Sequence, residues 1–433
     1  MTSRRIFHLA VPLIAAVAVL ATGCSAAAPP DARDAPRAEA SVDGVTVPDA
    51  FTAVTVETIG APPLPFPGTD GRFHVVYDLQ LTNATKIPAT LGRIDVVDGT
   101  DPERTIASFS GAALVDPSCT FGECNRLRDL PAGYVDSAVI PPQTSRVVFI
   151  DFTLDSLDQL PPVLLHRISG TGALSPAFGE PGAMEYLAAP LEISTRTLPV
   201  IAPPVRGDNW VALNGCCEPG FPHRSSVMSV NGKLNNSQRF AIDWKRTNDA
   251  GQFYAGDKTS NDSYIDYGAD ILAVADGTVV SILDGMADNA PGVLPAHDPE
   301  LAAKLTVENV DGNHVVLDLG GGVYAMYAHL IAGSVTVKPG DTVTEGQVLG
   351  HLGNTGNANA SHLHFQLMEG PSLLDSDSLP YAFESFDYAG QVAPELIADA
   401  DDYLTGTFLQ GALSRPDPRT GELPLGFAII DFP

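Results

Sequence analysis

Short stretches of alternating apolar and polar residues, separated by clusters of turn-forming residues, run through most of this chain. In the first half, residues 73–81 (FHVVYDLQL) and 145–154 (SRVVFIDFTL) combine β-branched and aromatic residues with a period of two, which is typical of strands. Turn clusters at 68–71 and 98–102 separate such runs, and no amphipathic helix of normal length interrupts them. Residues 47–200 are therefore predicted to form an immunoglobulin-like β-sandwich.

A proline-rich joint, residues 198–204 (LPVIAPP), follows this region. Beyond it, short strand-like runs again alternate with turns, and the 40 glycines and 36 prolines of the chain favour strands over a helix-rich fold. We expect a second all-β domain over residues 201–392. Residues 393–433 form a C-terminal extension, and its end, 424–432 (PLGFAIIDF), is predicted to be one last strand of either domain.

The N-terminus has the order of an export signal. Two arginines precede an apolar stretch, Ile6–Leu20, that is too short to span a bilayer, and small residues then lead to Cys24. This order resembles a lipoprotein signal peptide, in which cleavage before the cysteine frees it to carry lipid; an ordinary secretory signal is the alternative. We expect residues 1–23 to be the signal and 24–46 a flexible tether. The protein is then extracytoplasmic and lipid-anchored to the membrane of the cell envelope, or alternatively secreted.

The net charge and the number of cysteines limit the kinds of partner and site that the chain can have. The formal net charge is −28, and no cluster of lysine and arginine follows the N-terminal arginines, which argues against binding to nucleic acid or to an anionic membrane surface. Apart from Cys24, the cysteines are even in number, which favours disulfides in an exported chain over a zinc-thiolate site. Cys119 and Cys124 enclose a loop that suits a local bridge, whereas the adjacent Cys216 and Cys217 form either a vicinal bridge or two separate links.

The sharpest chemical signal lies in residues 361–367 (SHLHFQL). Residues two apart on a strand point to the same side, so His362 and His364 are expected to enter one pocket while Leu363 and Phe365 enter a core. Two imidazoles side by side on an apolar strand are costly unless a metal or a proton-transfer role stabilises them. A His-x-His pair alone is weak evidence for a metal or catalytic site, so the segments that accompany it must be considered.

Several further segments accompany this pair, namely 240–244 (FAIDW), 327–330 (YAHL) and 353–356 (GNTG). In order and spacing, together with HLHF at 362–365, they resemble the lysostaphin-like (LytM-type) zinc metallopeptidases over roughly residues 210–390. The resemblance implies a lysostaphin-type β-sheet peptidase domain with a duplicated hybrid motif. It also implies a zinc cofactor and the hydrolysis of peptide bonds in cell-wall peptidoglycan.

Residue by residue, the resemblance assigns Asp243 and His364 as zinc ligands. It assigns His329 and His362 as the pair that activates the attacking water and stabilises the tetrahedral intermediate. The residue types suit these roles, because imidazoles near a metal can take up a proton and hydrogen-bond a developing oxyanion. No Gly-x-Ser-x-Gly turn suggests a serine nucleophile instead.

One position departs from the family. The first family ligand is a histidine four residues before the aspartate, and here that residue is Arg239. A guanidinium has no lone pair for zinc. Two interpretations of Arg239 are open: a salt bridge with an acid such as Asp257, Asp262 or Asp266, or a contact for a substrate carboxylate.

His223 is the candidate replacement for the missing metal ligand. Asn231-Gly232 is a strong hairpin signal, and residues equally far before and after that turn face each other in a regular hairpin. His223 would then lie opposite Phe240, beside the backbone that carries the missing ligand in the family. The alternative is a histidine that faces solvent.

Two main functional hypotheses follow, beside a third in which the protein is an envelope scaffold, the sandwich carries the function and the peptidase-like domain is a relic. The first is a zinc metalloendopeptidase acting on peptidoglycan peptides, with the sandwich as a spacer or docking module. The second is a catalytically degenerate domain that binds peptidoglycan or regulates a separate amidase. The third metal ligand discriminates between them, because a site with only Asp243 and His364 would hold zinc weakly.

Overall fold

The computed structural model describes residues 41–42, 44–119, 122–175, 179–392 and 412–433. The chain divides into two compact units, Met1–Glu39 and Ala40–Pro433, and all the described residues belong to the second. The predicted signal segment, Cys24 and residues 393–411 of the predicted C-terminal extension lie outside the described residues. Among the described helices, none has the length and apolarity needed to cross a membrane.

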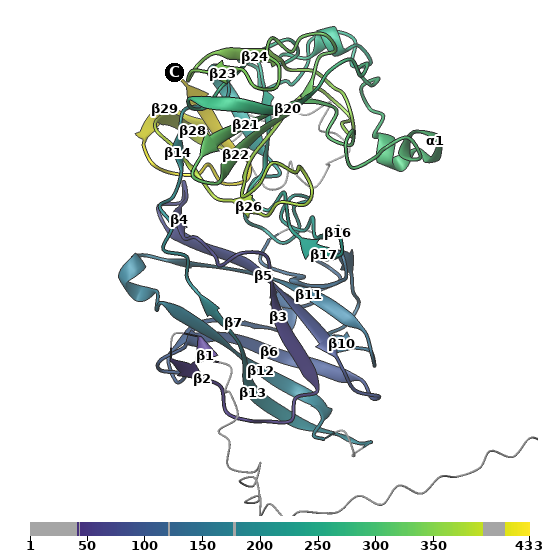
Figure 1. Ribbon diagram of the computed structural model, residues 1–433, viewed down its shortest axis with the longest axis vertical. Helices are drawn as coiled ribbons and strands as arrows, with labels where there is room; N and C mark the ends of the chain where they lie inside the picture. Colours follow the sequence, from purple (N-terminus) through teal and green to yellow (C-terminus); the bar gives the residue numbers. More distant parts are fainter. Residues whose placement is uncertain (1–40, 43, 120–121, 176–178, 393–411) are drawn as a thin grey trace, which may run out of the picture. The chain divides into compact units, whose positions relative to one another are not determined.

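The first domain is a sandwich of two antiparallel sheets, preceded by a small pair of strands, β1 (Ser41–Val42) and β2 (Val45–Thr46) (Figure 1). One sheet has the order β10 (Val139–Ile140), β6 (Ala89–Asp98), β12 (Val163–Ala173) and β13 (Pro181–Glu192), with β7 (Thr105–Ser110) beside β6. The other has the order β3 (Val54–Ile59), β5 (Phe73–Asn83), β11 (Ser145–Leu154), β8 (Leu127–Asp129) and β9 (Gly133–Tyr134), with β4 (Phe66–Pro67) beside β5. Two 3-10 turns complete it: η1 (Gly111–Ala113) and η2 (Leu157–Gln159).

Strand β5 is buried on both faces, which is unusual for a sandwich strand. Its odd-numbered residues, among them Val75, Tyr77 and Leu79, pack into the core between the two sheets. On its other face, Val76 belongs to the core of the second domain, and Asp78 has no exposed surface. The alternation that predicts a strand therefore also places Asp78 on the face opposite the sandwich core.

The buried His166 of β12 gives the sandwich a predicted acid sensitivity. Its Nε2 lies 2.8 Å from the Tyr77 hydroxyl and its Nδ1 lies 2.9 Å from the carbonyl oxygen of Ala189. Burial lowers the pKa of His166 from 6.5 to about 4, so between these values only the unfolded chain binds the proton. Stability must therefore fall as the pH drops through this window.

In the variant His166→Gln, the loss of unfolding free energy between pH 7 and pH 5 is expected to be smaller than in the wild type by about 2 kcal/mol. Urea unfolding at the two pH values measures this difference. Equal losses in both proteins would show that the pKa of His166 is the same in the folded and the unfolded chain.

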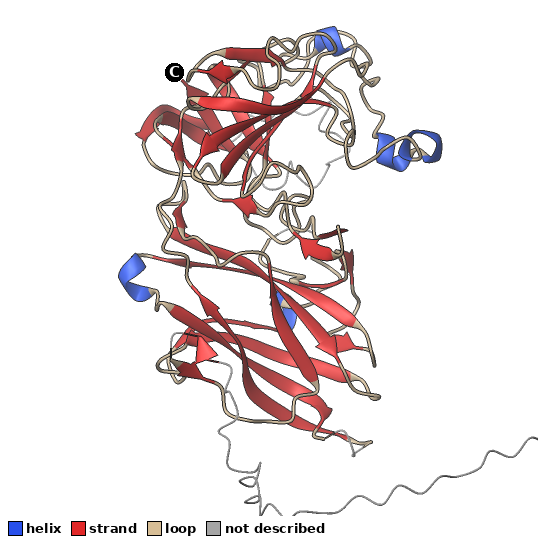
Figure 2. Cartoon of the chain, viewed as in Figure 1, coloured by secondary structure: helices blue, strands red, loops and turns tan. Residues whose placement is uncertain are grey.

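The second domain is built on one long antiparallel sheet (Figure 2). Its order is β23 (Thr342–Val343), β20 (Gly277–Leu283), β21 (Asn313–Gly320), β22 (Val323–Leu330), β25 (Leu363–Met368), β18 (Ile242–Arg246), β15 (Gly207–Leu213), β30 (Ala428–Phe432), β28 (Phe386–Gln391) and β29 (Ala412–Arg419), with β26 (Ser378–Leu379) beside β25. Smaller pairs are β14 (Val200–Ile201) with β27 (Ala382–Phe383), β16 (Met228–Val230) with β17 (Lys233–Asn235), and β19 (Asp270–Leu272) with β24 (Val348–His351). Helical turns are η3 (Asn261–Ser263), η4 (Pro295–His297) and α1 (Pro299–Ala302).

The all-β class predicted from the sequence is confirmed. The last strand, β30, pairs with β15 and β28, so the end of the chain is part of the second domain. This pairing explains the apolar pattern of the chain end, because Ala428 and Ile430 pack into the main core of this domain while Ile429 packs on the other side.

The two cysteine pairs are both disulfides, Cys119–Cys124 and the vicinal bridge Cys216–Cys217. Of the two alternatives left open for the adjacent cysteines, the structure shows the vicinal one. Both cysteines of this bridge are buried, and the Sγ of Cys217 lies 3.8 Å from Nδ1 of His74 on β5.

Candidate metal centre

Strands β18 and β25 bring Asp243 and His364 together. The two residues are direct partners in the antiparallel ladder, and the Nδ1 of His364 lies 3.0 Å from the Oδ1 of Asp243. The alternation expected for β25 is confirmed, because Leu363 and Phe365 point into the core with no exposed surface. Through its other ring nitrogen, His364 contacts Gln366, with Nε2 lying 3.0 Å from Oε1.

His223 joins this pair from a turn that precedes β16. Its Nε2 lies 3.4 Å from the Oδ2 of Asp243, and its ring centroid lies 4.7 Å from that of His364. Its Nδ1 lies 3.1 Å from the carbonyl oxygen of Ala241. With 7% of its surface exposed, His223 does not face solvent, so that alternative is wrong.

His223 is placed at the site by a turn, and not by the regular hairpin predicted from the sequence. The predicted register around the Asn231-Gly232 turn is present, with Met228 opposite Asn235. The ladder ends at Met228, however, and residues 222–225 form a turn. The turn brings the imidazole under the backbone at Ala241, one residue beyond the predicted partner.

The donor set fits a zinc ion. His223, Asp243 and His364 each offer one ligand atom, and these atoms lie within 4.8 Å of one another. In a tetrahedral zinc site with bonds of about 2.0 Å, neighbouring ligand atoms are about 3.3 Å apart. The Nε2 of His223 lies 3.4 Å from Oδ2 of Asp243, and the Nδ1 of His364 lies 3.0 Å from Oδ1 of the same carboxylate, so both imidazoles approach it at about this spacing. Both imidazoles also contact an acceptor through the other ring nitrogen, as zinc-binding histidines generally do.

A second pair of histidines flanks this cluster. His329 ends β22, and His362 directly precedes β25; their ring centroids are 4.6 Å apart. The Nδ1 of His329 lies 2.7 Å from the carbonyl oxygen of Thr355, and the Nδ1 of His362 lies 2.9 Å from that of Ala360. The Nε2 of His362 lies 3.4 Å from a carboxylate oxygen of Asp243, so this imidazole faces the cluster.

The backbone at His329 is strained. Its φ angle is 67°, in the left-handed region that a residue with a Cβ rarely adopts. Such a conformation costs on the order of 1–3 kcal/mol and persists where surrounding structure holds it, often at functional sites.

Burial and the central carboxylate set the charges of the site. Burial lowers the pKa of His223 to about 4, and it lowers the pKa values of His329 and His362 as well. These three imidazoles are thereby kept in the neutral form, which is the form that binds a metal or accepts a proton.

Asp243 and His364 are instead held in their charged forms. Burial alone would raise the pKa of Asp243, but the three neighbouring imidazoles of His223, His362 and His364 hold it well below its usual range. Burial also acts to lower the pKa of His364, and the hydrogen bond and charge of Asp243 outweigh it, so that the net pKa is raised. Positive charge is therefore favoured between Asp243 and His364, where a metal cation would lie.

Three polar groups near the site were not identified from the sequence. Asn214, after β15, donates its Nδ2 to the Oδ2 of Asp243 at 2.7 Å, and Gln366 contacts His364 as described above. Asp311 is 4% exposed, and burial, slightly offset by His364, raises its pKa to about 6. Its Oδ2 has no hydrogen-bond partner among the described residues. Gln366 lies in the 361–367 segment, but the sequence assigns it no role. Asn214 and Asp311 belong to no recognisable motif, because their positions depend on tertiary contacts.

Both interpretations of Arg239 need correction. The guanidinium does form salt bridges, but its partners are Asp78 of the sandwich and Asp377, and not Asp257, Asp262 or Asp266. With 3% of its surface exposed, Arg239 is not available to a substrate carboxylate. The residue that stands where the family has a ligand is instead part of the contact between the two domains.

The all-β domain thus brings together His223, Asp243 and His364, with the pair of His329 and His362 beside them. Residues 258–376 match the family model described as Peptidase family M23, which confirms the resemblance to lysostaphin-like peptidases over this part of the chain. The matched residues include His329, His362 and His364, and they begin after His223 and Asp243.

Similar proteins include one curated relative and several solved structures. The peptidoglycan DD-endopeptidase ShyA of Vibrio cholerae is 40% identical over 57 residues, which is 13% of this chain and 13% of ShyA. The catalytic domain of the M23 protein EnpA from Enterococcus faecalis is 18% identical, with 32% of this chain and 73% of that chain covered and a TM-score of 0.21. The catalytic domain of lysostaphin from Staphylococcus simulans is 23% identical, with 35% of this chain and 80% of that chain covered and a TM-score of 0.20.

Proposed function

We propose that this protein is a zinc metalloendopeptidase that hydrolyses peptide bonds of cell-wall peptidoglycan. The observation that carries the proposal is the position of His223, which would supply a third ligand in place of the arginine at position 239. The similarity to a peptidoglycan DD-endopeptidase supports peptidoglycan as the substrate class.

For this activity, His223, Asp243 and His364 would hold the zinc ion. The bound ion would supply an activated water and polarise the scissile carbonyl. His329 and His362 lie side by side and are neutral, so each can accept a proton through Nε2 while its Nδ1 donates to a backbone carbonyl. After accepting a proton, either imidazole can hydrogen-bond the oxyanion or protonate the departing amine.

A catalytically degenerate domain that binds peptidoglycan peptides or regulates an amidase is the second candidate. Arg239 is the observation that favours it, because the family ligand at that position is absent. Under this alternative, the cluster of His223, Asp243 and His364 would be a structural ion pair without a metal. Zinc binding separates the two candidates.

The proposal includes the place where the protein acts. Residues 1–24 have the order of a lipoprotein signal, which supports export and anchoring to the membrane through lipid on Cys24. Peptidoglycan lies outside the cytoplasmic membrane, so a tethered hydrolase would meet its substrate there.

The test is metal content and hydrolysis measured together. Purified protein is expected to contain about one zinc per chain by mass spectrometry, as one three-ligand site requires. It should release soluble peptides from purified peptidoglycan, and a chelator should stop the release until zinc is restored. Protein that takes up no zinc at micromolar metal would eliminate the enzyme and leave the binding module.

A further inference from the structure

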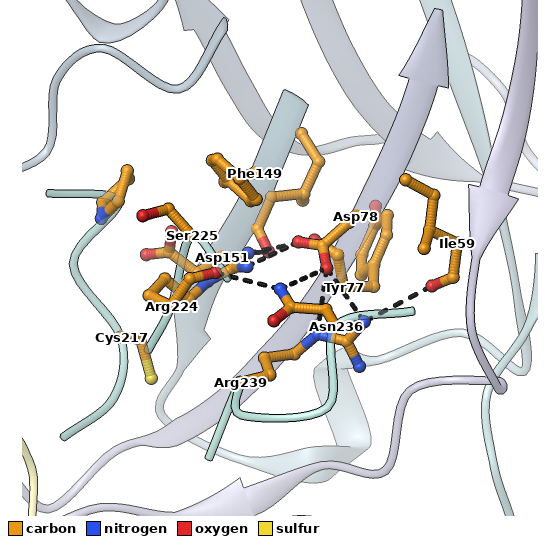
Figure 3. A network of polar contacts seen from close by, with 12 residues as sticks. Ile59, Tyr77, Asp78, Phe149, Asp151, Cys217, Arg224, Ser225, Asn236 and Arg239 are labelled. Atoms are coloured by element: carbon orange, nitrogen blue, oxygen red, sulfur yellow. Dashed lines mark hydrogen bonds and ion pairs between the residues drawn. The ribbon is translucent and has the colours of Figure 1, made fainter. Parts of the chain in front are cut away.

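Asp78 on β5 of the sandwich is buried in a network of groups from the second domain (Figure 3). Its Oδ1 accepts a hydrogen bond from Nη1 of Arg224. Its Oδ2 accepts one from Nδ2 of Asn236 at 2.8 Å and two from Arg239, at 3.1 Å from Nε and 2.8 Å from Nη2. Each of these donors lies in the second domain, although Asp78 lies in the first.

Arg224 ties the turn that carries His223 to the sandwich, because it directly follows His223 in the chain. Besides its ion pair with Asp78, its Nη2 donates to the carbonyl oxygens of Tyr77 and Ile150, both at 3.0 Å. The side chain has no exposed surface, and its Nη atoms thus contact two strands of the sandwich, β5 and β11.

Asn236 fixes the same turn from the other side. Its Nδ2 donates to the carbonyl oxygen of Arg224 at 3.0 Å as well as to Asp78. Its Oδ1 accepts from Oγ of Ser226 at 3.1 Å. One amide therefore links the Asp78 carboxylate to the backbone on the C-terminal side of His223.

Asp78 also neutralises two buried guanidinium groups. Burial would raise the pKa of Asp78, but the charges of Arg224 and Arg239 outweigh it and leave the pKa below its usual value. Without this carboxylate, Arg239 would keep Asp377 as an ion-pair partner, while Arg224 would lose its only direct one among the described residues. The buried charge would then favour rearrangement of the turn.

We infer that Asp78 is a positioning residue for the metal centre, and that the sandwich is consequently part of that centre and not a spacer. Asp78 holds Arg224 and Asn236, and these hold the turn that presents His223. This inference rests on the proposed function, in which His223 is a zinc ligand. The same carboxylate pairs with Arg239, which stands at the position of the family ligand. Asp78 therefore contacts both that residue and the groups that hold the turn carrying His223.

The experiment measures zinc affinity in the full exported chain by competition with a chromogenic chelator. Asp78→Asn and Asn236→Ala are expected to weaken zinc binding by about 10–100-fold, as loss of groups that orient a ligand does. The visible spectrum of the cobalt-substituted protein should change in both variants, because His223 shifts relative to the metal. The matched control is Asp95→Asn, a buried sandwich carboxylate paired with Arg93 and hydrogen-bonded to Ser108, which should bind zinc as the wild type does.

Each outcome decides the inference. If Asp78→Asn does not fold, Asn236→Ala carries the test, since it leaves every buried charge in place. Wild-type zinc affinity and cobalt spectra in both variants, alongside loss of zinc in His223→Ala, would overturn the inference and leave the proposed function standing. A wild type that binds no zinc would overturn both.

Discussion

Replacing His223 by alanine is expected to weaken zinc binding by more than about 100-fold, because removal of a ligand costs more than removal of the groups that orient one. Asp243 and His364 would remain as the two protein ligands. Zinc bound by two protein ligands exchanges readily with water and chelators. His364→Ala should have an effect of the same size. Equilibrium dialysis with zinc measures both variants.

The matched control is His314→Ala. His314 is also buried in the second domain, with its Nδ1 2.9 Å from the carbonyl oxygen of Gly312, but it is not in the cluster. Zinc affinity should be unchanged in this variant. If His223→Ala retained wild-type affinity while His364→Ala lost it, another group would have to serve as the third ligand, and the buried Asp311 would be the residue to replace next.

Local pattern was enough to predict the all-β class and the alternation around the His-x-His pair. Strand periodicity is a property of neighbouring residues, so β5, β11 and β25 can be read from a single sequence. The turn at Asn231-Gly232 is also local, and its register is the predicted one.

The contacts of Arg239 could not be predicted in the same way. Its partners Asp78 and Asp377 are 161 and 138 residues away in the chain, and one of them belongs to another domain. The acids that the sequence suggested, Asp257, Asp262 and Asp266, are not among its ion-pair partners in the described residues. Asp311 was missed for the same reason, since its burial beside the site depends on how β21 and β22 pack. The lipid anchor on Cys24 stays a prediction.

The second large effect concerns the histidine pair. His329→Ala and His362→Ala are each expected to lower kcat by about 10²–10⁴-fold, the usual contribution of a positioned acid or base. Zinc affinity should stay close to the wild-type value, because neither residue belongs to the three-ligand cluster. Peptide release from purified peptidoglycan, measured on zinc-loaded protein, gives the rates. His351→Ala is the control, since that half-exposed imidazole lies on β24 and pairs with Asp270.

The double variant tests whether the two imidazoles act together. Their rings are 4.6 Å apart, and each Nδ1 faces a backbone carbonyl, so the two Nε2 atoms are suited to one shared proton-transfer step. If they act as a unit, His329→Ala with His362→Ala should be little slower than either single variant, as for catalytic groups that depend on each other. Losses that multiply would mean separate roles, one imidazole for the water and the other for the oxyanion. A single variant that loses zinc along with activity would mean that this histidine is a ligand, and the division of roles would have to be redrawn.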